Sequence, residues 1–272
     1  MKTILIPIDF SASSIHMVNY TAELSNRQDI NQIILFSSFF VTLFEQIYPS
    51  ADFIQPGEED ILEQKQQCLQ QLEDLKTNLL KKLRGQTSVK VALIEKPLLR
   101  AILEIISVEQ PDVLFLNRTC SQMIEIAKIS PVPVLIIPEK ATYEPVQNAL
   151  VACDFRTLNH VSLLKRLHSI KHWPHPKLAL LNVDPLQKHL APEHPGQEIE
   201  GILKELLDGY EYQLYYSDDQ DILHGVLAFA EEHNQQMIIA LPGRHSFLYS
   251  LTHQSITEGL SADADKPVLI LK

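Results

Sequence analysis

Apolar residues gather in near-continuous runs of four to eight residues, with little polar alternation inside them. Runs of this length are typical of strands covered on both faces, as in a parallel sheet between layers of helices. The pattern therefore predicts ten buried strands, five in each half of the chain. They are Ile4–Ile8, Ile33–Phe40, Val89–Ile94, Val113–Leu116, Val132–Ile137, Ala149–Cys153, Leu178–Val183, Tyr212–Tyr216, Met237–Leu241 and Val268–Leu271.

Amphipathic stretches lie between these runs and predict helices. The clearest span residues 11–27, 58–83, 159–172 and 219–233. Ser11 or Ser13 can cap the first helix and Asp219 the last, because short polar side chains accept hydrogen bonds from free helix N–H groups. Alternating strands and helices predict a doubly wound α/β sheet with right-handed crossovers.

The chain also repeats itself. Three strand segments of the first half recur in the same order in the second. The pairs are Leu5–Phe10 with Leu150–Phe155, Asp112–Leu116 with Gln236–Ala240, and Pro133–Ile137 with Pro267–Leu271. Ordered self-similarity of this kind indicates a tandem duplication. We therefore expect two α/β domains, residues 1–140 and 146–272, each a five-stranded parallel sheet, joined by a polar linker at Glu139–Pro145.

Composition narrows the function classes. The chain is 45% hydrophobic and 21% charged, and no apolar run approaches the roughly 20 residues of a membrane helix. The net charge of −11 opposes a phosphate backbone, so neither nucleic acid nor a membrane is an expected partner. Three scattered cysteines without a Cys-x-x-Cys pair favour a reducing cytoplasm and exclude a disulfide framework.

Two motifs resemble those of universal stress proteins. The opening motif is Pro7–Ser11 followed by Tyr20–Leu24, and the closing motif is Ser255–Leu260 followed by Asp265–Ile270. The resemblance covers essentially the whole chain as two consecutive domains. It implies strand order 3-2-1-4-5, the adenine nucleotide alpha hydrolase-like fold, and a non-enzymatic cytoplasmic role in stress responses. It also implies pairing of the two fifth strands within the chain and, in many members, bound ATP or another adenine nucleotide.

Members that bind ATP follow the fourth strand with Gly-x-x-Gly, nine residues, and then Gly-Ser or Gly-Thr. The first half of this chain is ten residues shorter than the second between its fourth and fifth strands. A short turn at Asn117–Ser121 leads directly into a predicted stub of helix, and the half has no glycine after Gly85. A phosphate site built from close backbone approaches is therefore not expected there.

The second half keeps the full length of the connection between its fourth and fifth strands, but it lacks glycines at two of the motif's positions. Ser246 follows Gly243 and Arg244 where the second glycine would stand, and Gln254-Ser255 replaces Gly-Ser. Each added Cβ disfavours a left-handed backbone by about 1 kcal/mol or more. We favour a loop that only packs. The alternative is a site for ATP, AMP or another phosphate ligand, with the candidate residues Asp154, Gly243, Arg244, Ser246, Ser255 and Thr257.

Asp9 is a weaker candidate of the same kind, because it ends the first strand at the edge where open α/β sheets bind ligands. The alternative role for Asp9 and Asp154 is to cap the helices that follow them. His172, His175, His189 and His194 do not complete a zinc set, so no metal is expected. His245 and His253 flank the candidate loop and are expected to be polar residues at helix ends, or phosphate contacts when protonated.

Catalysis has little support in the sequence, which contains neither a Gly-x-Ser-x-Gly elbow nor a P-loop. The leading hypothesis is therefore binding or scaffolding. The alternatives are a nucleotide sensor using the second domain alone, and a carrier of small apolar ligands in an inter-domain groove. The helix at 58–83 is expected to bury most of its leucines against its own sheet. Because it is longer than the sheet, the alternative is that its protruding end contacts a protein partner or a second subunit.

Overall fold

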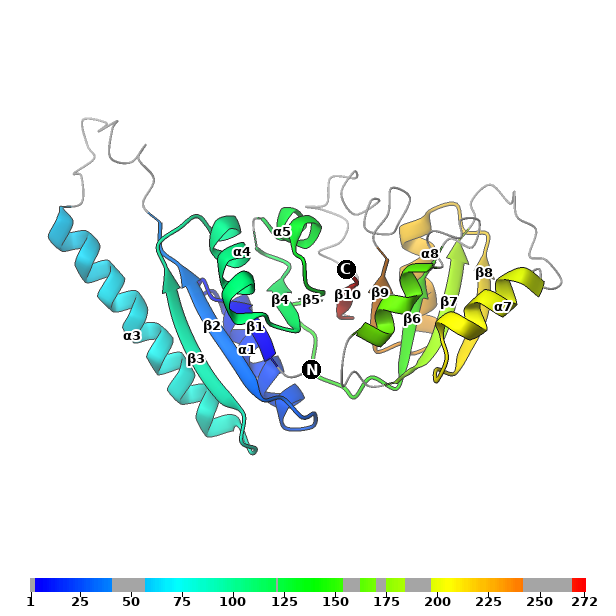
Figure 1. The fold of residues 1–272 in the computed structure, drawn as a ribbon, viewed down its shortest axis with the longest axis horizontal. Helices are drawn as coiled ribbons and strands as arrows, with labels where there is room; N and C mark the ends of the chain where they lie inside the picture. Colours follow the sequence, from blue (N-terminus) through cyan, green and yellow to red (C-terminus); the bar gives the residue numbers. More distant parts are fainter. Residues whose placement is uncertain are drawn as a thin grey trace. The chain divides into compact units, whose positions relative to one another are not determined.

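The computed structural model describes residues 3–40, 57–120, 122–153, 162–169, 175–183, 197–241 and 266–272. The chain forms two compact units, one spanning Lys2–Pro111 and the other Asp112–Lys272. Both units alternate strands with helices along the sequence, as Figure 1 shows by its colours.

The unit Lys2–Pro111 is a parallel sheet with helices packed on it. Its strands follow the order β3-β2-β1, and α3 lies along β3 and β2 (Figure 1). The central residues of β1 and most of those of β2 are apolar and buried, so they fill the core between helices, whereas β3 at the edge is only partly buried. The elements are β1 (Thr3–Pro7), α1 (Ala12–Ser25), β2 (Gln32–Ser38), α3 (Glu58–Lys82), β3 (Ser88–Ile94) and α4 (Leu98–Glu109).

Local polar contacts fix where the helices of this unit begin. The Ser11 Oγ accepts a hydrogen bond from the Ser14 N–H at 3.2 Å and caps α1. At the start of α3, the Gly57 N–H donates to the Asp60 carboxylate at 2.8 Å. Each contact satisfies a backbone or capping group that a helix end would otherwise leave unpaired. The predicted helices at 11–27 and 58–83 are both confirmed.

The unit Asp112–Lys272 contains the remaining strands. Its elements are β4 (Val113–Asn117), α5 (Met123–Ile129), β5 (Val134–Ile137), β6 (Asn148–Ala152), η1 (Ser162–Ser169), β7 (Lys177–Val183), α7 (Gln197–Leu206), β8 (Tyr212–Ser217), α8 (Ile222–Glu232), β9 (Met237–Ala240) and β10 (Val268–Ile270). All ten predicted strands of the chain are thereby confirmed.

The sheet of this unit follows the order β4-β5-β10-β9-β6-β7-β8. β10 pairs in parallel with β9 and antiparallel with β5, where Leu269 lies opposite Leu135. The second half of the chain therefore has the predicted order 3-2-1-4-5, as β8-β7-β6-β9-β10. The first half has β3-β2-β1 in one unit and β4-β5 in the other, and each part agrees with the same prediction.

The helix expected at 159–172 takes a different form. The described part, Ser162–Ser169, is a 3₁₀-helix. Its two described buried side chains, Leu164 and Leu167, are three residues apart and almost fully buried. Residues i and i+3 eclipse one another in a 3₁₀-helix, so this winding turns both leucines to one side. The sequence pattern located a helix here and did not distinguish its winding.

The connection between β5 and β6 is more buried than a polar linker would be. Ala141, Tyr143 and Val146 are 3%, 7% and 9% exposed. The Lys272 ammonium donates to the carbonyls of Ala127 and Lys128 at the end of α5, a favourable place for a cation. These contacts lie inside the unit that begins at Asp112, whereas the predicted domain boundary at 140–146 follows the sequence repeat and stays a prediction.

In the described part of the chain, no helix is long and apolar enough to cross a membrane.

Candidate functional site

Most of the candidate ligand residues fall outside the described part of the chain. The candidate residues outside it are Asp154, Gly243, Arg244, Ser246, Ser255 and Thr257. The histidines outside it are His172, His189, His194, His245 and His253. Asp9 is described, together with the turn after β4 and the start of α8. These three places follow the carboxyl ends of β1, β4 and β8.

Asp9 is held by the residue that caps the next helix. Its Oδ1 accepts from the Ser11 N–H at 3.0 Å and from the Ser11 hydroxyl at 2.6 Å. Partial burial acts to raise the pKa of Asp9, but hydrogen bonds from Ser11, together with smaller contributions from Ser14 and the Asp9 backbone, outweigh it and the pKa is lowered. Asp9 is thus a carboxylate in an Asx-turn that orients the cap of α1. This geometry agrees with the capping interpretation.

Phe10 separates these two residues and has a φ of 59°. This left-handed conformation is rare for a bulky residue, because its Cβ crowds the neighbouring carbonyl. The turn therefore stores a small strain, which the hydrogen bonds between Asp9 and Ser11 hold in place.

The connection from β4 to α5 is short. Five residues separate β4, ending at Asn117, from α5, which begins at Met123 and is only seven residues long. Asn117 is 5% exposed, and its Oδ1 has no hydrogen-bond partner among the described residues. The predicted short turn and stub of helix are confirmed. No glycine lies in this connection, so it lacks the residue type that lets backbone N–H groups approach a phosphate closely.

The start of α8 contains a cluster of two carboxylates and one imidazole. The Asp221 carboxylate caps the helix by accepting from the N–H groups of Leu223 and His224, at 2.8 and 3.1 Å. The expectation that Asp219 is the cap is therefore wrong. Asp219 lies two residues earlier, accepts from the Asp221 N–H at 2.9 Å, and contacts the His224 Nδ1 at 2.6 Å.

This contact shifts both groups toward their charged forms. Hydrogen bonding and the charge of Asp219 raise the pKa of His224 above its ordinary 6.5. The hydrogen bonds from Asp221 and His224 lower the pKa of Asp219 below 3.8. The pair therefore stabilises the fold at pH values between the lowered pKa of Asp219 and the raised pKa of His224. The contribution is lost as pH rises through the raised pKa of His224 and as pH falls through the lowered pKa of Asp219.

We expect Asp219→Asn to bring the pKa of His224 back toward 6.5, because the substitution removes the anion that favours imidazolium. A titration of the His224 ring followed by NMR measures this directly. Asp218→Asn is the matched control, since Asp218 makes no hydrogen bond or ion pair with His224. An unchanged His224 pKa in Asp219→Asn would show that the contact does not form in solution.

His175 has a packing role. Its ring lies against Tyr210, with the ring centroids 4.6 Å apart, and His168 meets Tyr210 edge-on at 5.4 Å. His168 also contacts the Leu206 carbonyl at 2.9 Å through its Nε2. Among the described residues there is no group of three or more histidine, cysteine or acidic side chains arranged to hold a metal ion.

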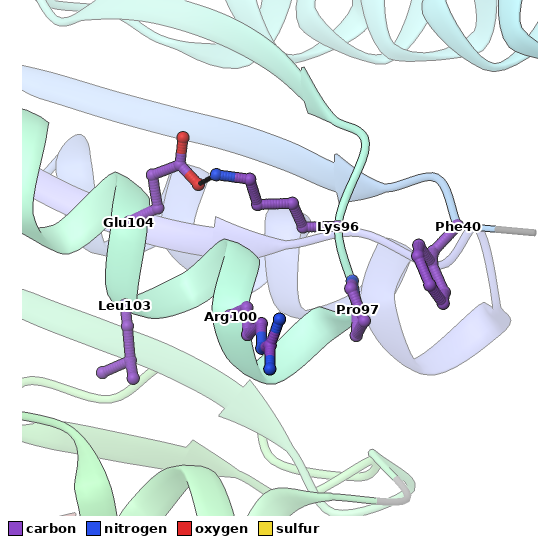
Figure 2. Close-up of a pocket in the computed structure, with 6 residues that line it drawn as sticks. All are labelled: Phe40, Lys96, Pro97, Arg100, Leu103 and Glu104. Carbon is purple, nitrogen blue, oxygen red and sulfur yellow. Dashed lines mark hydrogen bonds and ion pairs between the residues drawn. The ribbon is translucent and has the colours of Figure 1, made fainter. Parts of the chain in front are cut away.

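One hollow was not foreseen from the sequence. It measures about 390 Å³ and lies at the start of α4, where Phe40, Pro97 and Leu103 form its apolar walls. Figure 2 shows the Lys96 ammonium turned to Glu104, while Arg100 extends between Leu103 and Pro97. Arg100 makes no ion pair with any described residue. No local motif could have revealed the hollow, because it needs the end of β2 beside the start of α4.

Comparison with known proteins gives the fold a family context. The sequence matches no protein-family model and no curated protein at a significant level. A universal stress protein from Archaeoglobus fulgidus DSM 4304 matches 99% of this chain over 96% of its own length, with a TM-score of 0.64 and 16% identity. A functionally unknown protein from Pseudomonas aeruginosa PAO1 matches 100% of this chain over 92% of its own, with a TM-score of 0.55 and 14% identity.

Both matches extend over the full chain, which therefore has the fold of a tandem universal stress protein. The resemblance seen in the sequence motifs is confirmed at the level of fold. A shorter match is a universal stress protein from Arabidopsis thaliana with AMP bound, which covers 51% of this chain and 92% of its own, with a TM-score of 0.37 and 18% identity.

Proposed function

We propose that this protein is a non-enzymatic, cytoplasmic stress-response protein that acts by binding or scaffolding, and that neither half holds ATP in the manner of nucleotide-binding universal stress proteins. The observation that carries this proposal is the connection between β4 and α5. A phosphate loop needs several free N–H groups, glycine where backbone comes close, and a helix long enough to present its N-terminus. The first half offers five connecting residues without glycine and a helix of seven residues.

The first strand of that half supports the same conclusion. A ligand-binding acid at the end of β1 would need its carboxylate available to ribose or phosphate-bound metal. The Oδ1 of Asp9 instead accepts two hydrogen bonds from Ser11, at 3.0 and 2.6 Å. A nucleotide that used this oxygen would have to compete with the start of α1.

For the second half the support comes from the sequence. Ser246 and Gln254 stand where the phosphate loop would have glycine, and each adds a side chain at a close backbone approach. A catalytic role lacks support for the same kind of reason, because the sequence contains no nucleophile elbow and no P-loop.

The alternative is an adenine-nucleotide sensor that uses the second domain only. Arg244 favours it, since a guanidinium can grip phosphate through two parallel hydrogen bonds. Ser246, Ser255, Thr257 and Asp154 would supply the remaining polar groups. The two functions differ in whether ATP, ADP or AMP binds at all.

Thermal unfolding and calorimetric titration with ATP, ADP and AMP separate them. We expect no binding heat and no shift in Tm. A ligand present at a hundredfold excess over its Kd would stabilise the fold by about 2.7 kcal/mol, a shift of several degrees. Micromolar binding that Arg244→Ala abolishes would replace our proposal with the sensor. Arg100→Ala is the control, because it removes a guanidinium from α4 and leaves the loop intact.

A further inference from the structure

Only part of helix α3 packs closely against its own unit. Its two fully buried leucines, Leu72 and Leu79, lie in its C-terminal half. No described side chain from residue 59 to residue 71 is fully buried. These residues span about 20 Å of helix at 1.5 Å per residue. A helical segment of this length is marginal alone in water, so it gains much from a second apolar contact.

Three exposed leucines form a line along this helix. Leu62, Leu69 and Leu80 are 55%, 38% and 44% exposed. At about 100° per residue they lie within about 20° of one direction. Leu72 and Leu79 lie about 80–100° away from that line, toward the sheet. α3 therefore has one apolar face packed on its own strands and, beside it, a line of three exposed leucines open to a partner.

Charge is unevenly distributed along the same helix. Glu59, Asp60 and Glu63 lie in its first turns, whereas Lys81 and Lys82 lie in its last. Lys82 contacts Asn19 inside the unit at 2.6 Å, and Lys81 makes no ion pair with any described residue. By the helical repeat, Glu59, Glu63 and Lys81 lie on one flank of the leucine line, within about 40° of each other.

We propose that two copies of this chain associate through an antiparallel pairing of their α3 helices, with Leu62, Leu69 and Leu80 as the seam. A twofold pairing centred near Gln71 places Leu62 of one copy beside Leu80 of the other. It also sets the acidic end, with Glu59 and Glu63, against Lys81 of the second copy. A parallel pairing would set acid against acid, which disfavours it in a chain that already carries −11. The contact is self-complementary and closes as a dimer.

The middle of the seam limits its strength. Glu73 and Lys76 face the same side there and pair with each other at 3.0 Å. Polar groups in a helical seam specify its register at a cost in stability. The interface is also short. The dimer is therefore concentration-dependent, with a Kd below about 100 µM and above the nanomolar range.

Sedimentation velocity of the full chain, followed up to about 200 µM, tests the association. The expected result is a monomer–dimer equilibrium whose Kd rises at least tenfold in Leu62→Lys/Leu69→Lys. Val108→Lys is the matched control, because Val108 is 72% exposed on α4 and outside the seam. A chain that stays monomeric throughout, or a dimer that the double substitution leaves unchanged, overturns the proposal.

Disulfide trapping tests the direction of pairing. Leu62→Cys mixed with Leu80→Cys is expected to give cross-linked dimers well above the level of the unsubstituted chain. Leu62→Cys alone is expected to stay at that level. Efficient cross-linking of Leu62→Cys with itself would overturn the antiparallel arrangement. Lys81→Glu is expected to weaken the dimer, and adding Glu59→Lys with Glu63→Lys to the same chain is expected to restore it. Lack of restoration would rule out the charge pairing.

Discussion

Replacing Leu269 with alanine is expected to lower the free energy of unfolding by about 3–4 kcal/mol. Leu269 is fully buried in β10. It lies opposite Leu135 of β5 on one side and Ile239 of β9 on the other. Truncation removes apolar contacts and leaves a cavity in the middle of a sheet whose strands cannot easily close around it. Urea unfolding, with the midpoint lowered at an unchanged m-value, measures the effect.

The matched control is Val108→Ala, which removes apolar atoms from a side chain that is 72% exposed. Its expected effect is within about 0.5 kcal/mol, as for most surface substitutions. If Leu269→Ala cost no more than this control, β10 would not lie between β5 and β9 in the folded protein. The same result also tests whether β10 completes the sheet of the second half.

Gly225→Val is expected to destabilise the protein by about 2–3 kcal/mol. Gly225 is buried in α8, at a close approach between the helix and β7. A Cβ at this position would meet the Asp219 Cβ at 3.0 Å and the Val183 Cγ1 at 3.2 Å. Glycine in a helix is otherwise unfavourable by about 1 kcal/mol, so its use here reflects lack of space.

Gly201→Val is the control for this substitution. Gly201 lies in α7, and a Cβ added there meets nothing within 4 Å. Valine is a better helix residue than glycine, so Gly201→Val should be neutral or slightly stabilising. Thermal unfolding compares the two. A Gly225→Val chain as stable as the Gly201→Val chain would mean that α8 is free to move away from β7. Movement of Asp219 should also show as a lower pKa of His224.

Regular elements could be predicted from local pattern. The apolar runs located all ten strands, because a strand covered on both faces requires apolar residues at successive positions. Ser11 was correctly among the expected caps of α1. At α8 the same reasoning selected Asp219, and the structure uses Asp221. Both residues are chemically able to cap, and the helix begins at Ile222, which makes Asp221 the cap.

Some features of the candidate site could likewise be predicted from the sequence, and others could not. The missing length and missing glycines of the first half are properties of the sequence, and the five-residue connection into α5 follows from them. The hydrogen bonds that occupy Asp9 involve residues two positions away, so they too were within reach of local reasoning. The hollow at α4 was not, because Phe40 and Pro97 are brought together only by the pairing of β2 with β3.

The sequence alone determined the duplication, the strand positions and the short connection without glycine between β4 and α5, since each depends on residue type and spacing along the chain. The tertiary structure decided which leucines of α3 pack and which stay exposed, and how β5 and β10 register. Those outcomes depend on distances between segments far apart in the chain. Such distances are set by how closely helices can approach the sheet, as Gly225 and Val183 show.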